Sequence, residues 1–332
     1  MSVDVGNGKP IEFKKGQKLR LGLFLPGSGN QYMKSYTASG LAEAKKLGLD
    51  VKVYDPAFNA TTQVNQMQNA IQQKAIDLAV VHAADGTVTC NAVTKSMPAA
   101  NILVNAVIIP QCDTGTSQTG KSGDELWVPG MLNFVGSNNT LGWNVKWFEA
   151  AAKANPGPQK AALILGQATG GQSRVIQKAL KLWQTQNPGS QFKVIDTVNT
   201  DYSAPDTFKK TQSYLQAHPD VNVLMVASSP DQTQGAVKAV DQAGKAGKVK
   251  IINSGGDPYS IDGIKKGSIQ LTMPQFPTTS VKLAIDSVVN AARGTKQPKF
   301  VDDSASGGNS IDNPLITTKA NVDQAPSGEY GG

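Results

Sequence analysis

The chain has 332 residues, of which 39% are hydrophobic and 17% are charged, with 33 glycines and 18 prolines. This composition predicts a loop-rich globular protein of two domains and excludes disordered, coiled-coil and collagen-like chains. The formal net charge is +7, but the lysines form only short groups without interleaved aromatic residues, so we expect no nucleic-acid partner. No apolar run approaches the roughly 18 residues that a membrane-spanning helix needs.

The first third of the chain alternates short apolar segments with longer amphipathic ones. Val64, Met67, Ala70 and Ile71, for example, recur at helical spacing. Strands are expected at residues 19–25, 51–54, 78–81 and 102–107, with helices at 32–47, 61–74 and 88–97. Strands and helices that alternate in this way predict right-handed crossovers and a parallel sheet.

Residues 110–130 interrupt this alternation, because they are rich in Gly, Thr, Ser and Asp and show no periodicity. The alternation then restarts. Further strands are expected at 161–165, 192–197, 223–226, 250–253 and 269–273, and helices at 173–184, 204–217, 232–243, 261–266 and 279–292. Two sets of similar size predict an α/β fold of two doubly wound parallel-sheet lobes.

The two cysteines, Cys90 and Cys112, each follow an expected strand. If these strands are parallel neighbours, both side chains lie at one edge of the sheet and approach bonding distance. The placement favours a disulfide, and hence an oxidising compartment, over two unrelated buried thiols. Residues 1–17 lack the apolar core of a signal peptide. The protein is therefore either cytoplasmic or, as the disulfide favours, extracytoplasmic with its signal segment absent from this chain.

Ligands of open parallel sheets bind beyond the carboxyl ends of the strands. Amide, carboxylate and guanidinium groups there suit the hydroxyls of a sugar or sugar alcohol, and aromatic rings suit its C–H face. The residues that follow the expected strands include both kinds: Asn30, Tyr32, His82, Asp85, Ile108, Ile109, Arg174, Tyr202, Ser229, Asp231, Asp257 and Gln275. All of these except Ile108 and Ile109 are candidate ligand-binding residues.

Five stretches, in this order along the chain, resemble the type I periplasmic sugar-binding proteins of the ribose-binding type. They are GLAEAKKLG at 40–48, GSNNTLG at 136–142, AHPDV at 217–221, residues 235–245, and GSIQLTMPQ at 267–275. The resemblance covers residues 18–322. It implies a solute-binding protein of an ABC transporter, monomeric and without a cofactor, whose partners are a carbohydrate or polyol and a membrane permease.

The resemblance also implies a three-strand hinge, crossed near Ser137, Gln275 and Asp302. The hinge divides the chain into an N-terminal linker and two lobes that each use discontinuous segments. These are 1–17 for the linker, 18–136 plus 276–302 for the N-terminal lobe, and 137–275 plus 303–332 for the C-terminal lobe.

Several binding positions carry over from the family to this sequence. Asn30 matches an amide, Tyr32 and Tyr202 match ring-stacking aromatics, and Gln275 matches a glutamine near the hinge. His82 stands where the family often has Asn or Asp. For each residue the ordinary alternative is a helix cap or a place in the core.

Other positions depart from the family pattern in register or residue type. Arg174 lies two residues before the usual arginine, and Asp257 lies two residues beyond the expected aspartate. Ser229 replaces an asparagine, with Asp231 nearby. Each is expected to contact the ligand only after a local adjustment of its loop.

The clearest departure is Ile108-Ile109, where ribose-type proteins have an Asp-Arg pair that binds sugar hydroxyls. An apolar pair removes those contacts, so a smaller or linear polyol becomes a reasonable candidate. Asn105, Asp85 or the loop at Cys112 is expected to compensate.

Two other functional classes were weighed against a binding protein. Gly27-Ser28-Gly29 is an isolated glycine-rich turn without a phosphate-loop lysine or a complete dinucleotide fingerprint, and His82 and His218 belong to no zinc-ligand cluster. These observations disfavour an enzyme and a metal site. A lac-repressor-like regulator shares the expected fold but needs a DNA-binding helix-turn-helix, where only 17 residues precede Lys18. It remains the alternative, with a small-molecule sensor of another ligand class.

Overall fold

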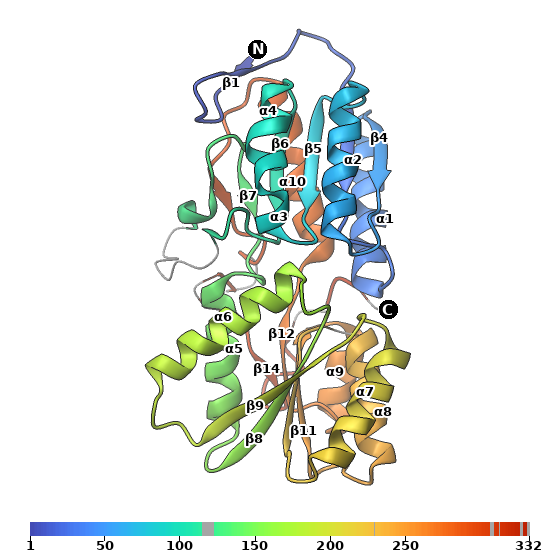
Figure 1. Ribbon diagram of the computed structural model, residues 1–332, viewed down its shortest axis with the longest axis vertical. Coiled ribbons are helices and arrows are strands. Elements are labelled where there is room, and N and C mark those ends of the chain that lie inside the picture. The colour runs from blue at the N-terminus through green and yellow to red at the C-terminus, as the bar shows by residue number, and fades with distance from the viewer. Residues whose placement is uncertain (115–122, 229, 306–308, 312, 326–327, 331–332) are drawn as a thin grey trace.

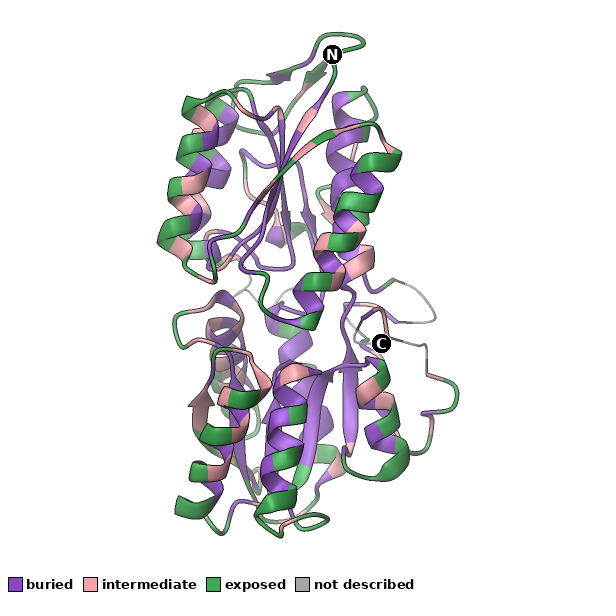
Figure 2. Cartoon of the chain, turned by 90° about the vertical axis from the view of Figure 1, so that its right-hand side faces the viewer, coloured by how far each residue is buried: buried purple, intermediate pink, exposed green. Residues whose placement is uncertain are grey.

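The computed structural model describes residues 1–114, 123–228, 230–305, 309–311, 313–325 and 328–330. In this part of the chain two α/β lobes lie one above the other, each built on a six-stranded sheet with helices against it (Figure 1). The strands are largely buried in both lobes, and exposed residues gather on the outer faces of the helices (Figure 2). The two-lobed parallel-sheet fold expected from the sequence is confirmed.

The N-terminal lobe has an entirely parallel sheet in the order β13-β7-β6-β5-β3-β4. Its strands are β3 (Arg20–Phe24), β4 (Asp50–Tyr54), β5 (Leu78–His82), β6 (Leu103–Val107), β7 (Phe134–Val135) and β13 (Phe300–Val301). Its helices are α1 (Gln31–Lys46), α2 (Ala60–Gln72), α3 (Gly86–Asn91), which continues through a π-helical turn (Ala92–Ser96) into α4 (Met97–Ala99), and α10 (Pro277–Ala292). A 3₁₀ turn (Asp124–Leu126) follows the loop after β6.

The C-terminal lobe has the strand order β14-β12-β11-β10-β8-β9, parallel except for the edge strand β14. Its strands are β8 (Gln159–Leu165), β9 (Phe192–Asn199), β10 (Val223–Val226), β11 (Lys250–Gly255), β12 (Leu271–Pro274) and β14 (Thr317–Thr318). Its helices are α5 (Leu141–Ala154), α6 (Gly171–Gln186), α7 (Ala204–Ala217), α8 (Asp231–Gln242) and α9 (Pro258–Lys266). Separate apolar clusters form on the two faces of this sheet.

The segment expected to be a linker, residues 1–17, is instead part of the N-terminal lobe. Its strands β1 (Ser2–Val3) and β2 (Ile11–Glu12) form an antiparallel pair. Val5, Ile11 and Phe13 are buried in the main core of the lobe. Their burial explains the folding of this segment, because it removes apolar surface from water.

Helix α5 is the second element absent from the sequence-based expectation. It precedes the first strand of its lobe, so it falls outside the strand-then-helix alternation used to find the others. Trp143, Trp147 and Phe148 on this helix are nonetheless almost fully buried and sit at helical spacing. β7 and β13 were also not anticipated, since two residues are too few to show a periodicity.

The chain passes between the lobes after β7, between β12 and α10, and again after β13. The buried carboxylate of Asp303 connects these passages. Its two oxygens accept hydrogen bonds of 2.5 Å from the Ser137 and Ser280 hydroxyls. Ser137 and Asp303 lie in the first and third passages, and Ser280 lies in the first turn of α10, directly after the second. The cluster therefore fixes the three segments relative to one another.

Candidate ligand-binding site

A cavity lies between the lobes, where the carboxyl ends of the two sheets face each other. Its volume open to the centre of a water molecule is about 70 Å³. Both lobes and the first crossing segment contribute to its lining, among others through Asn30, Tyr32, His82, Asn138, Tyr202 and Gln275. The position agrees with the rule that open parallel sheets bind ligands beyond the carboxyl ends of their strands.

Five of the residues expected from the sequence line this cavity: Asn30, Tyr32, His82, Tyr202 and Gln275. Asn30 caps helix α1, and its Oδ1 accepts a hydrogen bond of 2.9 Å from the Met33 amide. Tyr32 follows in the first turn of the same helix, and His82 ends β5. Their contact with a ligand remains a prediction.

Tyr202 approaches the cavity from the loop after β9. Its backbone has a φ of 71°, and its ring stacks on Phe58 of the opposite lobe with centroids 5.2 Å apart. The ring also lies against Gly166, where an added Cβ would overlap it. A glycine at 166 is therefore required for this placement of the tyrosine.

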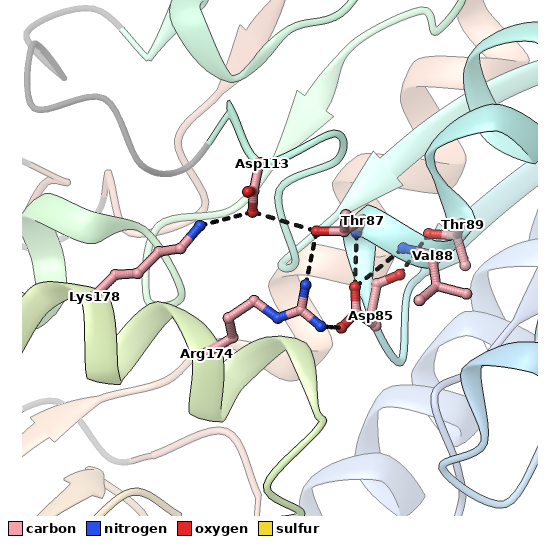
Figure 3. Close-up of polar contacts among 7 residues, drawn as sticks. All are labelled: Asp85, Thr87, Val88, Thr89, Asp113, Arg174 and Lys178. Carbon is pink, nitrogen blue, oxygen red and sulfur yellow. Dashed lines mark hydrogen bonds and ion pairs between the residues drawn. The ribbon is translucent and has the colours of Figure 1, made fainter.

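Asp85 and Arg174 do not line the cavity but form an ion pair with each other across the gap between the lobes (Figure 3). Asp85 also caps α3, accepting hydrogen bonds from the Thr87 and Val88 amides at 2.8 and 3.1 Å. Arg174 Nη1 donates to the Thr87 hydroxyl at 3.1 Å. Each charge therefore has a protein partner in this structure, and ligand contact by Asp85 or Arg174 stays a prediction.

Lys178 extends this interaction by one helical turn of α6, pairing with Asp113 at 2.9 Å (Figure 3). Asp113 directly follows Cys112, which is disulfide-bonded to Cys90 of α3, so the expected disulfide is confirmed. The Cys112 amide further donates to the Gly86 carbonyl at 2.9 Å. The disulfide thus holds the Asp113 loop beside the start of α3. We call Asp85, Thr87, Asp113, Arg174 and Lys178 the charged latch.

Three further candidates have structural partners and are absent from the cavity lining. Asn105, in the middle of β6, donates to Asn133 Oδ1 at 2.5 Å inside the N-terminal lobe. Asp257 caps α9 and accepts from the Tyr259 amide at 3.0 Å. Asp231 accepts from the Gln31 amide of the opposite lobe at 2.9 Å. The structure does not bring these three residues into the cavity lining, so their ligand contacts stay untested predictions, and Ser229 lies outside the described residues.

Asn138 and Asn139 also line the cavity, although the sequence analysis did not select them. They follow β7, so the rule of carboxyl ends would have found them had this two-residue strand been recognised. Phe58, Gln167 and Ile109 also line the cavity. Ile109 thereby places an apolar group where ribose-type proteins are expected to carry a charged one.

The described lining contains no side chain that is charged at neutral pH. Burial lowers the pKa of His82 to about 3, so its imidazole is neutral. Burial also raises the pKa of Tyr202 to about 12 and raises that of Tyr32 well above its ordinary value. The cavity therefore presents amides, hydroxyls, a neutral imidazole and aromatic rings.

Two parallel-sheet lobes, three chain crossings and an uncharged cavity between strand ends define a two-lobed binding protein. A family model described as a periplasmic binding protein domain matches residues 21–296. The chain belongs to this family.

Among curated proteins, the chain is 22% identical to the ribose import binding protein of Bacillus subtilis over 294 residues, 88% of each chain. It is 21% identical to the D-ribose/D-allose-binding protein of Pseudomonas aeruginosa over 281 residues, 84% of this chain and 83% of the relative.

Solved structures of similar fold include the Caulobacter myo-inositol binding protein bound to myo-inositol. It has a TM-score of 0.76 and 20% identity, with 93% of this chain and 96% of that chain covered. An ABC transporter solute-binding protein from Mycobacterium smegmatis with bound glycerol has a TM-score of 0.74 and 22% identity, with 95% and 100% covered. At these identities the structural likeness supports the fold.

Within the described part of the chain, no helix combines the length and apolar character that a membrane crossing requires. In the same residues no group of three or more His, Cys, Asp and Glu side chains is arranged to hold a metal ion.

Proposed function

We propose that this protein is the extracytoplasmic solute-binding component of an ABC importer and that it carries a neutral monosaccharide or sugar alcohol. The observation that carries the proposal is the uncharged, amide-rich and aromatic lining of the cavity between the lobes. Amides supply both donors and acceptors for hydroxyl groups, and aromatic rings pack on C–H faces. The ribose-binding and D-allose-binding relatives and the inositol-bound structure support this ligand class.

The size of the cavity supports a single sugar unit. The volume of 70 Å³ counts only the space that the centre of a water molecule can reach, and in this kind of volume one water needs about 10–15 Å³. In the liquid, one water occupies about 30 Å³. The cavity therefore has room for roughly five to seven waters, or about 150–200 Å³ of liquid. This space suits a monosaccharide or a short polyol better than an oligosaccharide.

Binding by closure of the lobes explains how a buried ligand enters. Direct contacts between the lobes, such as the 2.8 Å hydrogen bond from the Gly171 amide to the Ala84 carbonyl, correspond to a closed arrangement. Rotation about the crossing segments would open the cavity, and a ligand bound to both walls would favour the closed state. A membrane permease that receives the closed form is the proposed partner.

A thermal-shift screen tests the proposal with D-ribose, D-allose, D-arabinose, D-tagatose, myo-inositol and glycerol. We expect at least one compound to raise the Tm of the protein in a concentration-dependent way. The same compound should be recovered unchanged after long incubation, because the proposed role is binding without chemistry. Tm shifts confined to sugar acids and sugar phosphates, tested in parallel, would contradict the proposal.

A further inference from the structure

The amides that the sequence assigned to the ligand are largely engaged by the protein itself. Gln275 Oε1 accepts a 3.0 Å hydrogen bond from the Tyr330 hydroxyl, and its Nε2 donates to the Ser254 hydroxyl at 3.0 Å. Asn30 uses its Oδ1 to cap α1. Neither side chain offers its full hydrogen-bonding capacity to a ligand.

Asn138 differs from both of these amides. Its side chain is 4% exposed and lines the cavity, and neither Oδ1 nor Nδ2 has a hydrogen-bond partner among the described residues. A buried amide in this condition is unfavourable unless something else completes its hydrogen bonds. Asn138 is thus a residue of the cavity lining whose donor and acceptor are both left unused by the described residues.

Two other lining residues each have one buried polar atom without a hydrogen-bond partner among the described residues. Tyr32 Oη and His82 Nδ1 also lack partners among the described residues, although their residues are only 8% and 5% exposed. The Tyr32 hydroxyl lies beside the Asn138 side chain: burial chiefly raises the pKa of the tyrosine and a weak interaction with the Asn138 amide lowers it, but no hydrogen bond of ordinary length and angle joins the two groups. The Tyr32 and His82 rings are in edge contact, with centroids 6.3 Å apart.

Packing behind these groups restricts their movement. The Tyr32 ring meets Tyr330 edge-on at 5.2 Å, and the His82 ring meets Tyr36 at 5.3 Å. Asn138 directly follows Ser137, whose hydroxyl is bonded to Asp303. The ordering entropy of these side chains is thus largely lost before a ligand binds, which favours affinity.

We propose that Asn138, with Tyr32 Oη and His82 Nδ1, binds a pair of adjacent hydroxyls on a neutral ligand, and that Asn138 determines specificity at this end of the cavity. This inference rests on the proposed function. Each hydroxyl both donates and accepts, which matches an amide that offers one group of each kind. Because Asn138 belongs to a segment that crosses between the lobes, the same contact links recognition to closure.

The test starts with isothermal titration calorimetry of the wild-type protein against D-ribose, D-allose, D-arabinose and myo-inositol. Binding of none of them would defeat the proposed function itself. With the tightest-binding compound, Asn138→Ala is expected to lose about 10- to 100-fold in affinity, as for a hydrogen-bonded pair lost inside a closed site. The Tm of the free variant should stay at the wild-type value, because Asn138 has no described partner to lose.

Analogues of that compound, each lacking one hydroxyl, show whether the contact is direct. The analogue without the bound hydroxyl should have the same affinity for wild type and Asn138→Ala, whereas the others should retain the difference. If Asn138→Ala fails to fold, Asn138→Asp serves instead: it keeps the size but removes the donor, and it should weaken binding at pH 7.

Asn155→Ala is the matched control. Asn155 is also buried, but it donates to the Ala151 carbonyl and to Gln270 Oε1, both at 2.9 Å and away from the cavity. This variant should lower Tm and leave affinity unchanged. Affinity of Asn138→Ala within twofold of wild type, or equal losses for every deoxy analogue, would overturn the inference while leaving the proposed function in place.

Discussion

The two lobes meet through two unlike regions, the charged latch and the cavity. In the latch, acidic residues of the N-terminal lobe pair with Arg174 and Lys178 of α6. In the cavity, every described lining side chain is neutral, and several buried polar atoms have no partner among the residues that the structure describes. The charges of the latch therefore contact each other, whereas unused hydrogen-bonding capacity lies where charge is absent.

This difference separates two energetic roles. Charges on partly exposed side chains such as Arg174, 37% exposed, contribute modestly and are screened by salt. Buried neutral groups lose much more when they are left unsatisfied, and a matching ligand recovers that loss. The latch should thus adjust the balance between open and closed forms, whereas the cavity should determine which molecule binds.

The largest effect is expected from placing a charge in the neutral region. Gln275→Glu removes the donor to Ser254 and buries a carboxylate near the Ala227 carbonyl. We expect affinity for the tightest-binding neutral sugar to fall at least about 100-fold at pH 7.5, since an unpaired buried charge is strongly unfavourable. Calorimetry measures this change, and Gln184→Glu on the exposed surface of α6 is the control. Equal affinity of the two variants would contradict the neutral-cavity account.

Removing an aromatic wall should have the next largest effect. Tyr202→Ala deletes a ring that lines the cavity and stacks on Phe58 of the other lobe. Lost apolar burial and stacking predict a loss of about 10- to 50-fold in affinity. Tyr259→Ala, a half-buried tyrosine on α9, should leave affinity unchanged. Unchanged affinity in Tyr202→Ala would remove this residue from the site.

The buried carboxyl group at the crossings predicts a pH dependence of stability. Burial is the main cause that raises the pKa of Asp303 to about 7. The hydrogen bonds from Ser137 and Ser280 lower this pKa, and the nearby charges of Asp302 and Glu329 raise it further. Between about pH 4 and pH 7 the folded state therefore holds a proton that the unfolded state has lost. The free energy of unfolding should fall as pH rises through this window and then level off.

Comparison of wild type with Asp303→Asn isolates this contribution. The wild-type Tm relative to the variant should decrease by several degrees between pH 4.5 and pH 7.5. Differential scanning calorimetry at both pH values measures it. A difference that is constant with pH, or that grows in the opposite direction, would show that Asp303 is ionised throughout this range in the folded protein.

The smallest effect is expected from the latch. Arg174→Gln removes the pair with Asp85 across the lobes, and we expect affinity to fall only about two- to fivefold at low salt. The deficit should shrink at about 0.5 M salt because screening weakens the wild-type pair. A loss above 50-fold, together with altered ranking of sugars, would show that Arg174 contacts the ligand after all.

The sequence was informative wherever one physical rule acted locally. Short apolar strands followed by amphipathic helices located every strand of the two six-stranded sheets except the two-residue strands β7, β13 and β14, and residues 204–217 coincide with α7. The same rule missed α5, which precedes its lobe's first strand, and the β1–β2 pair, whose apolar residues are buried only through the rest of the lobe.

The candidate site shows the limit of local rules more clearly. Position after a strand was enough to place Tyr32, His82 and Tyr202 in the cavity lining. The pairing of Asp85 with Arg174 was not accessible, because it depends on how the two lobes meet. Nor does sequence reveal which amides are already used: Gln275 is bonded to Tyr330, 55 positions away in the chain, while the Asn138 amide has no ordinary hydrogen bond to any described residue.

The central claim is that a neutral, hydroxylated ligand closes the lobes, and small-angle X-ray scattering combined with titration tests it most directly. The probe is whichever of D-ribose, D-allose and myo-inositol binds most tightly, measured beside its phosphorylated counterpart. We predict that the neutral compound lowers the radius of gyration at saturation and that the phosphorylated one neither binds comparably nor compacts the protein. Binding without compaction, or equal binding of the phosphorylated compound, would contradict the account.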